Sequence, residues 1–146
     1  MNSKLDIAVA KFQEGFNCSQ AVMYSFSDEL HIEKDTALKL ACGFGAGMGR
    51  KEEVCGAVTG GIIVIGCKHG RGEKDDLAAT ELTYSKTREL MDQFALKHGT
   101  FSCRKLLAGC DIATEEGKKY FNQNNLRNTI CLPCVQSVVE ILEHIM

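Results

Sequence analysis

The chain has 146 residues, of which 45% are hydrophobic, so it is long enough for one globular domain with a single core. The formal net charge is −2, and three tyrosines without a tryptophan offer no basic stripe or stacking platform, which argues against a nucleic-acid partner. The N-terminal residues lack the apolar core of a signal peptide, and the longest apolar run is too short to span a bilayer. We therefore expect a single domain over residues 1–146 that is cytoplasmic, without membrane insertion.

Helical periodicity begins at the N-terminus. Ser3 is placed to cap a first helix, and Asn17 to cap a second, which puts Cys18 in the first turn with its thiol on the inward face. A third, short helix is predicted to start at Asp35. It ends at a glycine-rich loop of residues 43–49.

An apolar run over residues 54–67 follows this loop and predicts a buried central helix. Glycine inside a helix costs about 1 kcal/mol relative to alanine, so Gly56 and Gly60 require compensation from a close backbone or a bound group. Their Gly-x-x-x-Gly spacing would also suit a homodimer through this face.

The second half of the chain predicts three more helices. The longest spans residues 73–97, a short one carries Cys103, and the last runs from about residue 131 to 145. Residues 111–128 are polar and are expected to form a partly helical, exposed segment. The inward residues of the longest helix are expected to be Leu77, Tyr84, Leu90, Met91 and Phe94. No segment has convincing strand periodicity, so the fold class is all-α: a compact bundle of about six to seven helices with a glycine-rich loop before the central helix.

The central motif has a recognisable pattern. Residues 43–49 read Gly-Phe-Gly-Ala-Gly-Met-Gly, and residues 55–61 read Cys-Gly-Ala-Val-Thr-Gly-Gly. This stretch resembles the C_GCAxxG_C_C family of redox-active proteins, small chains named for a C-G-A-x-x-G motif and four signature cysteines. The segments around Cys18 and Cys103 look like the first and third cysteine sites of the family, and Cys55 fills the motif cysteine.

The fourth site lies at Cys131 or Cys134, and the apolar spacing that follows fits Cys131 better. Cys18, Cys55, Cys103 and Cys131 each fall near the start of a predicted helix, on its apolar side. The helix dipole lowers the pKa of a thiol there, and both metal ligation and disulfide exchange require thiolate.

The first hypothesis is that these four cysteines hold an iron–sulfur cluster or, less favoured, another metal such as zinc. The resemblance adds support for electron transfer to a redox partner protein, because relatives of the family occur joined to cytochrome-like modules. The spacing between the cysteines matches no paired zinc-ribbon pattern, so only the fold could assemble such a site.

Two alternatives remain open. Residues 131–134 read Cys-Leu-Pro-Cys at a helix start, an arrangement that thiol–disulfide oxidoreductases use, so Cys131 and Cys134 are candidate catalytic residues of a metal-free thiol exchanger. Cys55 and Cys103 are a second candidate pair for this chemistry. The remaining alternative is a non-enzymatic bundle in which the cysteines only pack, as is expected for Cys42, Cys67 and Cys110.

The glycine-rich loop lacks the preceding strand and the Gly-Lys-Ser/Thr ending of a nucleotide-binding loop. Its expected role is to bring backbone close to the cysteines. Gly45, Gly47 and Gly56 are therefore the candidate cofactor-binding glycines.

Overall fold

The computed structural model describes residues 2–146, and these residues fold into a bundle of α-helices. The helices are α1 (Lys4–Gln13), α2 (Cys18–Phe26), α3 (Lys34–Ala41), α4 (Gly45–Met48), α5 (Gly56–His69), α6 (Leu77–His98), α7 (Cys103–Leu106), α8 (Glu115–Gln123) and α9 (Leu132–Ile145), with the short turns η1 (Cys42–Phe44) and η2 (Arg127–Cys131). Among the described residues, β pairing is limited to one isolated bridge between Val54 and Ser102. The all-α prediction is confirmed, with slightly more helices than expected because short turns such as α4 and α7 interrupt the chain.

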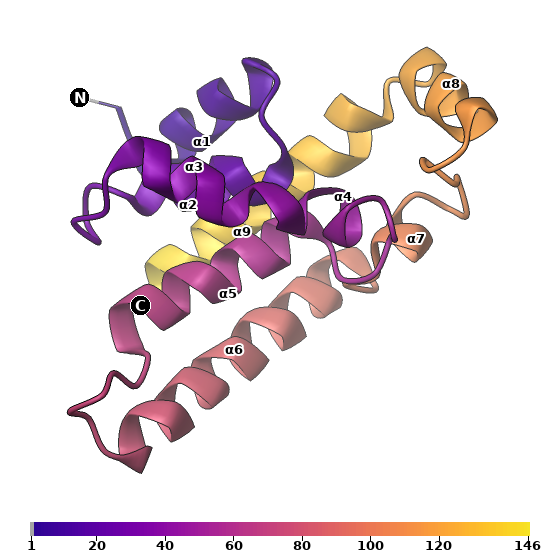
Figure 1. Cartoon of the computed structure of the whole chain (residues 1–146). Helices are drawn as coiled ribbons and strands as arrows, with labels where there is room; N and C mark the ends of the chain where they lie inside the picture. Colours follow the sequence, from indigo (N-terminus) through magenta and orange to yellow (C-terminus); the bar gives the residue numbers. More distant parts are fainter. Residues whose placement is uncertain (1) are drawn as a thin grey trace.

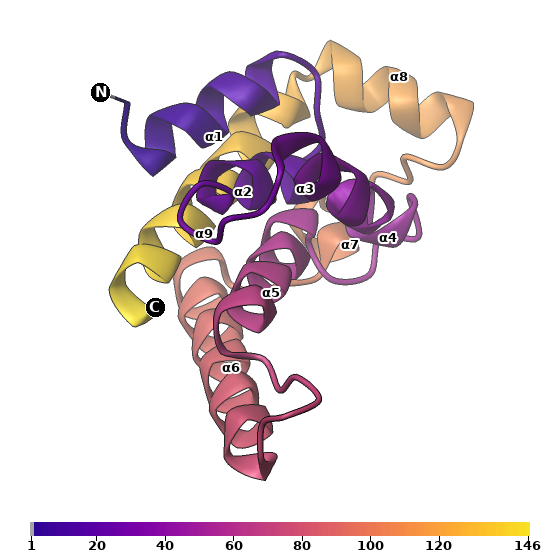
Figure 2. The ribbon, with the colours of Figure 1, turned by 60° about the vertical axis from the view of Figure 1, so that its left-hand side comes forward.

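Helix α5 lies at the centre of the bundle (Figure 1). It packs against α2, α6 and α9, while α1 and α3 cover the outer side of α2. Helix α8 is set apart from these helices, beyond α7 (Figure 2). The apolar core is formed mainly where α2, α5 and α9 meet, and the starts of these three helices lie at one end of it.

The predicted starts of the first two helices are confirmed by their caps. Ser3 and Asn17 each form a capping box, in which the side chain accepts a backbone N–H from the third helical residue and that residue's side chain accepts the N–H of the cap. The third helix begins earlier than predicted, because Glu33 and not Asp35 is its cap. The cap at Asn17 fixes Cys18 as the first residue of α2.

Two expectations for the longest helix are wrong. Leu77 and Tyr84 are 59% and 56% exposed, whereas Leu90 and Phe94 are fully buried. The helix begins at Leu77, where Asp76 caps it, and its first turns extend away from α9 (Figure 2). Only the later turns reach the core.

The glycines of α5 allow close contact within the chain. A Cβ at Gly60 would lie 2.7 Å from the backbone oxygen and 2.9 Å from the Cα of Ser19 in α2. Gly56 is likewise buried against the segment that precedes α5. The Gly-x-x-x-Gly face is therefore packed against other parts of this chain, so a homodimer would have to form through another surface.

Substituting Gly60 with alanine should destabilise the fold by about 1–3 kcal/mol, because the Ser19 backbone cannot move away without displacing α2. Gly66 is the matched control in the same helix, since nothing lies within 4 Å of a Cβ built there. Gly66→Ala should raise stability by about 1 kcal/mol through helix propensity. Urea unfolding of the two variants measures both effects. A loss of stability of similar size in both would show that close packing against α2 does not explain the effect of the Gly60 substitution.

Candidate functional site

Five cysteines line one cavity of about 100 Å³ at the end of the bundle. They are Cys18, Cys55, Cys103, Cys131 and Cys134. Cys55, Cys103 and Cys134 are buried, whereas Cys18 and Cys131 are half-buried. Apolar side chains such as Leu106 and Ile112 form much of the remaining wall. The fold thus brings together all the cysteines of the first hypothesis, and it adds Cys134 to them.

The start of a helix positions each of these thiols. Cys18 and Cys103 are the first residues of α2 and α7, and Cys55 is the N-terminal cap of α5. Cys131 ends the π-helical turn η2, and Cys134 follows in the first turn of α9. Helix starts from four parts of the chain therefore meet at one cavity, a convergence that cannot be derived from sequence spacing.

The thiols lie in two neighbouring pairs, and all the cysteines are free of disulfides. Cys18 pairs with Cys131, and Cys55 pairs with Cys134. The sequence suggested other pairs, within residues 131–134 and between Cys55 and Cys103. Cys131, in the turn before α9, therefore lies next to Cys18 of α2, whereas Cys134, in α9, lies next to Cys55 at the start of α5. Cys103 lies near both pairs.

The expected lowering of thiol pKa at helix starts is found at Cys55. Its pKa is lowered by the hydrogen bond from the Cys134 thiol and by the backbone N–H groups of Ala57 and Val58 at the start of α5. The effect on Cys134 is opposite: its pKa is raised by the same hydrogen bond, by burial and by neighbouring thiols.

Cys18 and Cys103 do not follow that expectation. The hydrogen bond to Cys131, together with burial, raises the pKa of Cys18 well above its ordinary value. Burial and then the neighbouring Cys55 raise the pKa of Cys103 from 9.0 to about 12. Crowding of thiols in an apolar cavity here outweighs the helix dipole, because thiolates held close together repel each other.

The stability of the reduced, metal-free protein should fall as pH rises from 9 towards 12, the interval between the ordinary and the folded pKa of Cys103. Over this interval the unfolded thiol loses its proton while the folded thiol keeps it, so the unfolded state binds fewer protons and gains stability. The loss attributable to Cys103 is up to about 4 kcal/mol. Urea unfolding across this pH range should show that the free energy of unfolding falls less steeply with pH in Cys103→Ser than in Cys42→Ser, which changes an exposed thiol. Equal dependence of this free energy on pH in the two variants would contradict this account.

The glycine-rich loop forms a left-handed turn beside the cavity. Five consecutive residues have positive φ: Ala46 at 56°, Gly47 at 66°, Met48 at 68°, Gly49 at 62° and Arg50 at 70°. The N–H of Gly49 donates to the carbonyl oxygen of Gly45 at 3.0 Å. Left-handed backbone costs roughly 1–2 kcal/mol for each residue with a side chain, and such strain concentrates at functional sites. The alternating glycines are the sequence signal for this turn.

A side chain at any of the three candidate glycines would crowd its neighbours, most severely at Gly45 and Gly47. A Cβ at Gly47 would be 2.8 Å from the Cβ of Cys103, and one at Gly56 would be 3.3 Å from the Cβ of Cys18. A Cβ at Gly45 would overlap the side chain of Asn17. Of the three, Gly56 lines the cavity itself. The other two let the loop pack against the residues that hold Cys18 and Cys103.

Sequence reasoning missed Glu52, which belongs to none of the motifs. The residue is 3% exposed, and neither carboxylate oxygen has a well-formed hydrogen bond in the described part of the chain. Burial raises its pKa, while Arg104, with its Nε 3.9 Å from a carboxylate oxygen, acts in the opposite direction. Glu52 lies behind Cys103, since its backbone oxygen accepts the N–H of Arg104. No sequence pattern distinguishes it from an exposed glutamate.

The remaining cysteines lie outside the cavity. Cys42 and Cys67 are exposed, and the half-buried Cys110 donates its thiol hydrogen to the carbonyl oxygen of Gly117 at 3.2 Å. Within residues 2–146, no group of three or more His, Cys, Asp or Glu side chains has the arrangement of a metal-ion site. The same residues contain no helix long and apolar enough to cross a membrane.

The fold and the cavity define an all-α, cysteine-rich protein with a cluster of free thiols at the ends of its helices. The family model described as "Putative redox-active protein (C_GCAxxG_C_C)" matches residues 16–145, and the chain belongs to this family of redox-active proteins. The resemblance inferred from the motif is confirmed. No curated protein and no solved structure matches the chain.

Proposed function

We propose that the protein holds an iron–sulfur cluster through Cys18, Cys55, Cys103 and Cys131 and transfers electrons to a partner protein. The observation that carries this proposal is the convergence of five free thiols on one cavity, in a chain that belongs to a redox-active family. Clustered cysteine thiolates are the ligands that iron–sulfur clusters use.

The lining of the cavity, as well as its thiol ligands, suits an iron–sulfur cluster. Apolar side chains surround the thiols, and the absence of a side chain at Gly56 leaves open the space beside Cys18. The four proposed ligands come from the separate elements α2, α5, α7 and η2, so their thiols approach the cavity from different parts of the fold.

The charges of the site also favour a bound cation. The pKa of Cys18 is raised by its interaction with Cys131 and by burial, and the pKa of Cys103 is raised by burial and by the neighbouring thiols. Metal ions reverse this balance, since a coordinating thiol is deprotonated outright. A bound cluster would supply one-electron chemistry, and the N–H groups of Ala57 and Val58 aimed at the Cys55 sulfur would tune its reduction potential.

The fifth thiol has a separate role in this proposal. Cys134 keeps its proton, because its hydrogen bond to Cys55 raises its pKa, and it is 1% exposed. Cys131 is half-buried and lies next to Cys18. We assign Cys131 as the fourth ligand and Cys134 as a thiol that donates a hydrogen bond to the Cys55 sulfur.

Cys131→Ser and Cys134→Ser form the matched pair that tests this assignment. Cys131→Ser should lose most of the bound iron and sulfide. Cys134→Ser should keep the cluster, with an altered reduction potential because the hydrogen bond to a ligating sulfur changes. Iron and sulfide analysis with redox titration of anaerobically purified variants measures both effects, and loss of the cluster in Cys134→Ser alone would reverse the assignment.

The second candidate function is metal-free thiol–disulfide exchange, and the two neighbouring thiol pairs favour it. In such a reaction Cys18 and Cys131 would lose two electrons and two protons to a disulfide substrate, which would be reduced to two thiols, while a disulfide formed on the protein. The cysteine with the lowered pKa, Cys55, is only 6% exposed, whereas the more accessible Cys18 has a raised pKa. The thiol that ionises more readily is thus not the thiol that a substrate can reach, which makes thiol–disulfide exchange the weaker candidate.

A further inference from the structure

A second pocket, of about 380 Å³, opens beside the cysteine cavity. The two share the wall residues Asn17, Ala46, Ile112, Phe121 and Arg127. Asn17 directly precedes Cys18, and Arg127 lies one helical turn before Cys131. The second pocket is therefore continuous with the half-buried side of the thiol cluster.

Three cations from separate elements line this second pocket. They are Arg50 after the left-handed turn, Lys118 of α8 and Arg127 of η2, and the amides of Asn17 and Asn122 accompany them. No carboxylate is among the described residues that line it. Positive charge gathered in a pocket whose lining contains no carboxylate favours an anionic ligand.

Arg127 forms a rigid part of this wall. Its guanidinium donates hydrogen bonds to the backbone oxygens of Phe12 and Phe16 and stacks 3.8 Å above the ring centroid of Phe12. The Nζ of Lys118 lies 3.6 Å from a carboxylate oxygen of Glu115 on the surface of α8, and an exposed ion pair of this type contributes little to stability. Arg50 forms no ion pair with any described residue. Arg50 and Lys118 are thus available to a ligand.

We propose that this pocket binds a low-molecular-weight thiol that carries carboxylates, with its charged end against Arg50, Lys118 and Arg127. Its sulfur would then lie at the mouth of the cavity, beside Cys18 and Cys131. The connection to the thiol cluster favours a sulfur compound over a simple anion. This inference rests on the proposed function, because it names the small molecule that approaches the same site.

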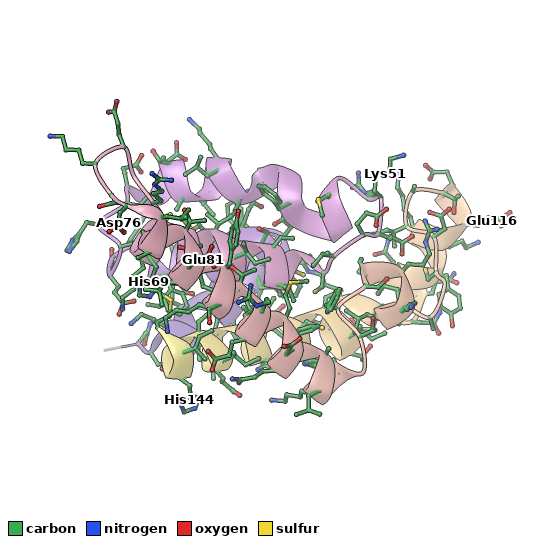
Figure 3. All side chains as sticks on the ribbon, turned by 90° about the horizontal axis from the view of Figure 1, so that it is seen from below. Lys51, His69, Asp76, Glu81, Glu116 and His144 are labelled. Atoms are coloured by element: carbon green, nitrogen blue, oxygen red, sulfur yellow. The ribbon has the colours of Figure 1, made fainter. Side chains whose placement is uncertain are left out.

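The test uses S-methylglutathione, which carries the carboxylates but cannot form a disulfide, titrated calorimetrically into the full chain purified without oxygen. Arg50→Gln and Lys118→Gln should each weaken binding about tenfold through loss of a charge-assisted hydrogen bond. The matched controls are Lys51→Gln and Lys119→Gln, which change the adjacent exposed lysines outside the pocket wall. Lys51 lies at the end of the molecule opposite His69 and Asp76 (Figure 3).

Lack of binding, or equal binding by all four variants, would overturn the inference. Inorganic phosphate competing as strongly as the peptide would also overturn it, because the pocket would then recognise charge alone. Iron and sulfide content measured on the same samples separates the two proposals. Cys55→Ser protein without a cluster should still bind the probe, since Cys55 does not line the second pocket.

Discussion

Cys55→Ser protein should contain no stoichiometric iron or acid-labile sulfide and should show no visible absorption when purified without oxygen. Cys55 is buried at the cap of α5, and it is the thiol whose pKa is lowered by Cys134 and by two backbone N–H groups. It also contributes to the raised pKa values of Cys18, Cys103 and Cys134, so it lies close to each of these thiols. Serine keeps the shape but offers an oxygen that ionises far less readily than a thiol.

Cys42→Ser is the control for this variant, because Cys42 is exposed and lies outside the cavity. It should keep the iron, the sulfide and the spectrum of the unsubstituted protein. Both variants should remain folded by circular dichroism, which separates loss of ligation from loss of structure. Full cluster content in Cys55→Ser would contradict the proposed ligand set.

Gly47→Ala should destabilise the protein by about 3 kcal/mol or more and lower its cluster content. A Cβ there would lie 2.6 Å from the Cα of Glu52, 2.7 Å from the N of Glu53 and 2.8 Å from the Cβ of Cys103. Backbone atoms cannot move aside as a flexible side chain can, so overpacking adds to the strain of an alanine at a φ of 66°. Urea unfolding and iron content measure the two effects.

Gly49 supplies the matched control, because it has nearly the same conformation, with a φ of 62°, but nothing lies within 4 Å of a Cβ built there. Gly49→Ala should therefore cost only the conformational strain, about 1 kcal/mol. The difference between the variants isolates the contact with Cys103 and the following loop. Equal losses would show that the turn, and not its packing against the cysteine, determines the effect.

Local signals predicted much of the fold. The capping residues Ser3 and Asn17 and the apolar run of α5 locate helices correctly, because caps and periodicity act within a few residues. The exposure of Leu77 and Tyr84 was not predictable in this way. Periodicity identifies one face of α6, but how far the neighbouring helices extend along that face depends on tertiary packing.

The site was predictable in part. The positions of Cys18, Cys55 and Cys103 at helix starts followed from helix signals and from the resemblance, and the structure places them at one cavity. The pairing of Cys18 with Cys131 was not predictable, because it depends on how η2 meets α2. Pattern reasoning also overlooked the raised pKa of Cys103, since the cost of burying neighbouring thiols appears only when their distances are fixed.

The most direct test of the central claim is iron and acid-labile sulfide per chain, with a visible absorption spectrum, on the unsubstituted protein purified without oxygen. The account predicts stoichiometric iron and sulfide and a coloured protein that bleaches on reduction. Colourless, metal-free protein with a reversibly reducible disulfide between Cys18 and Cys131 would contradict it and leave thiol exchange as the function.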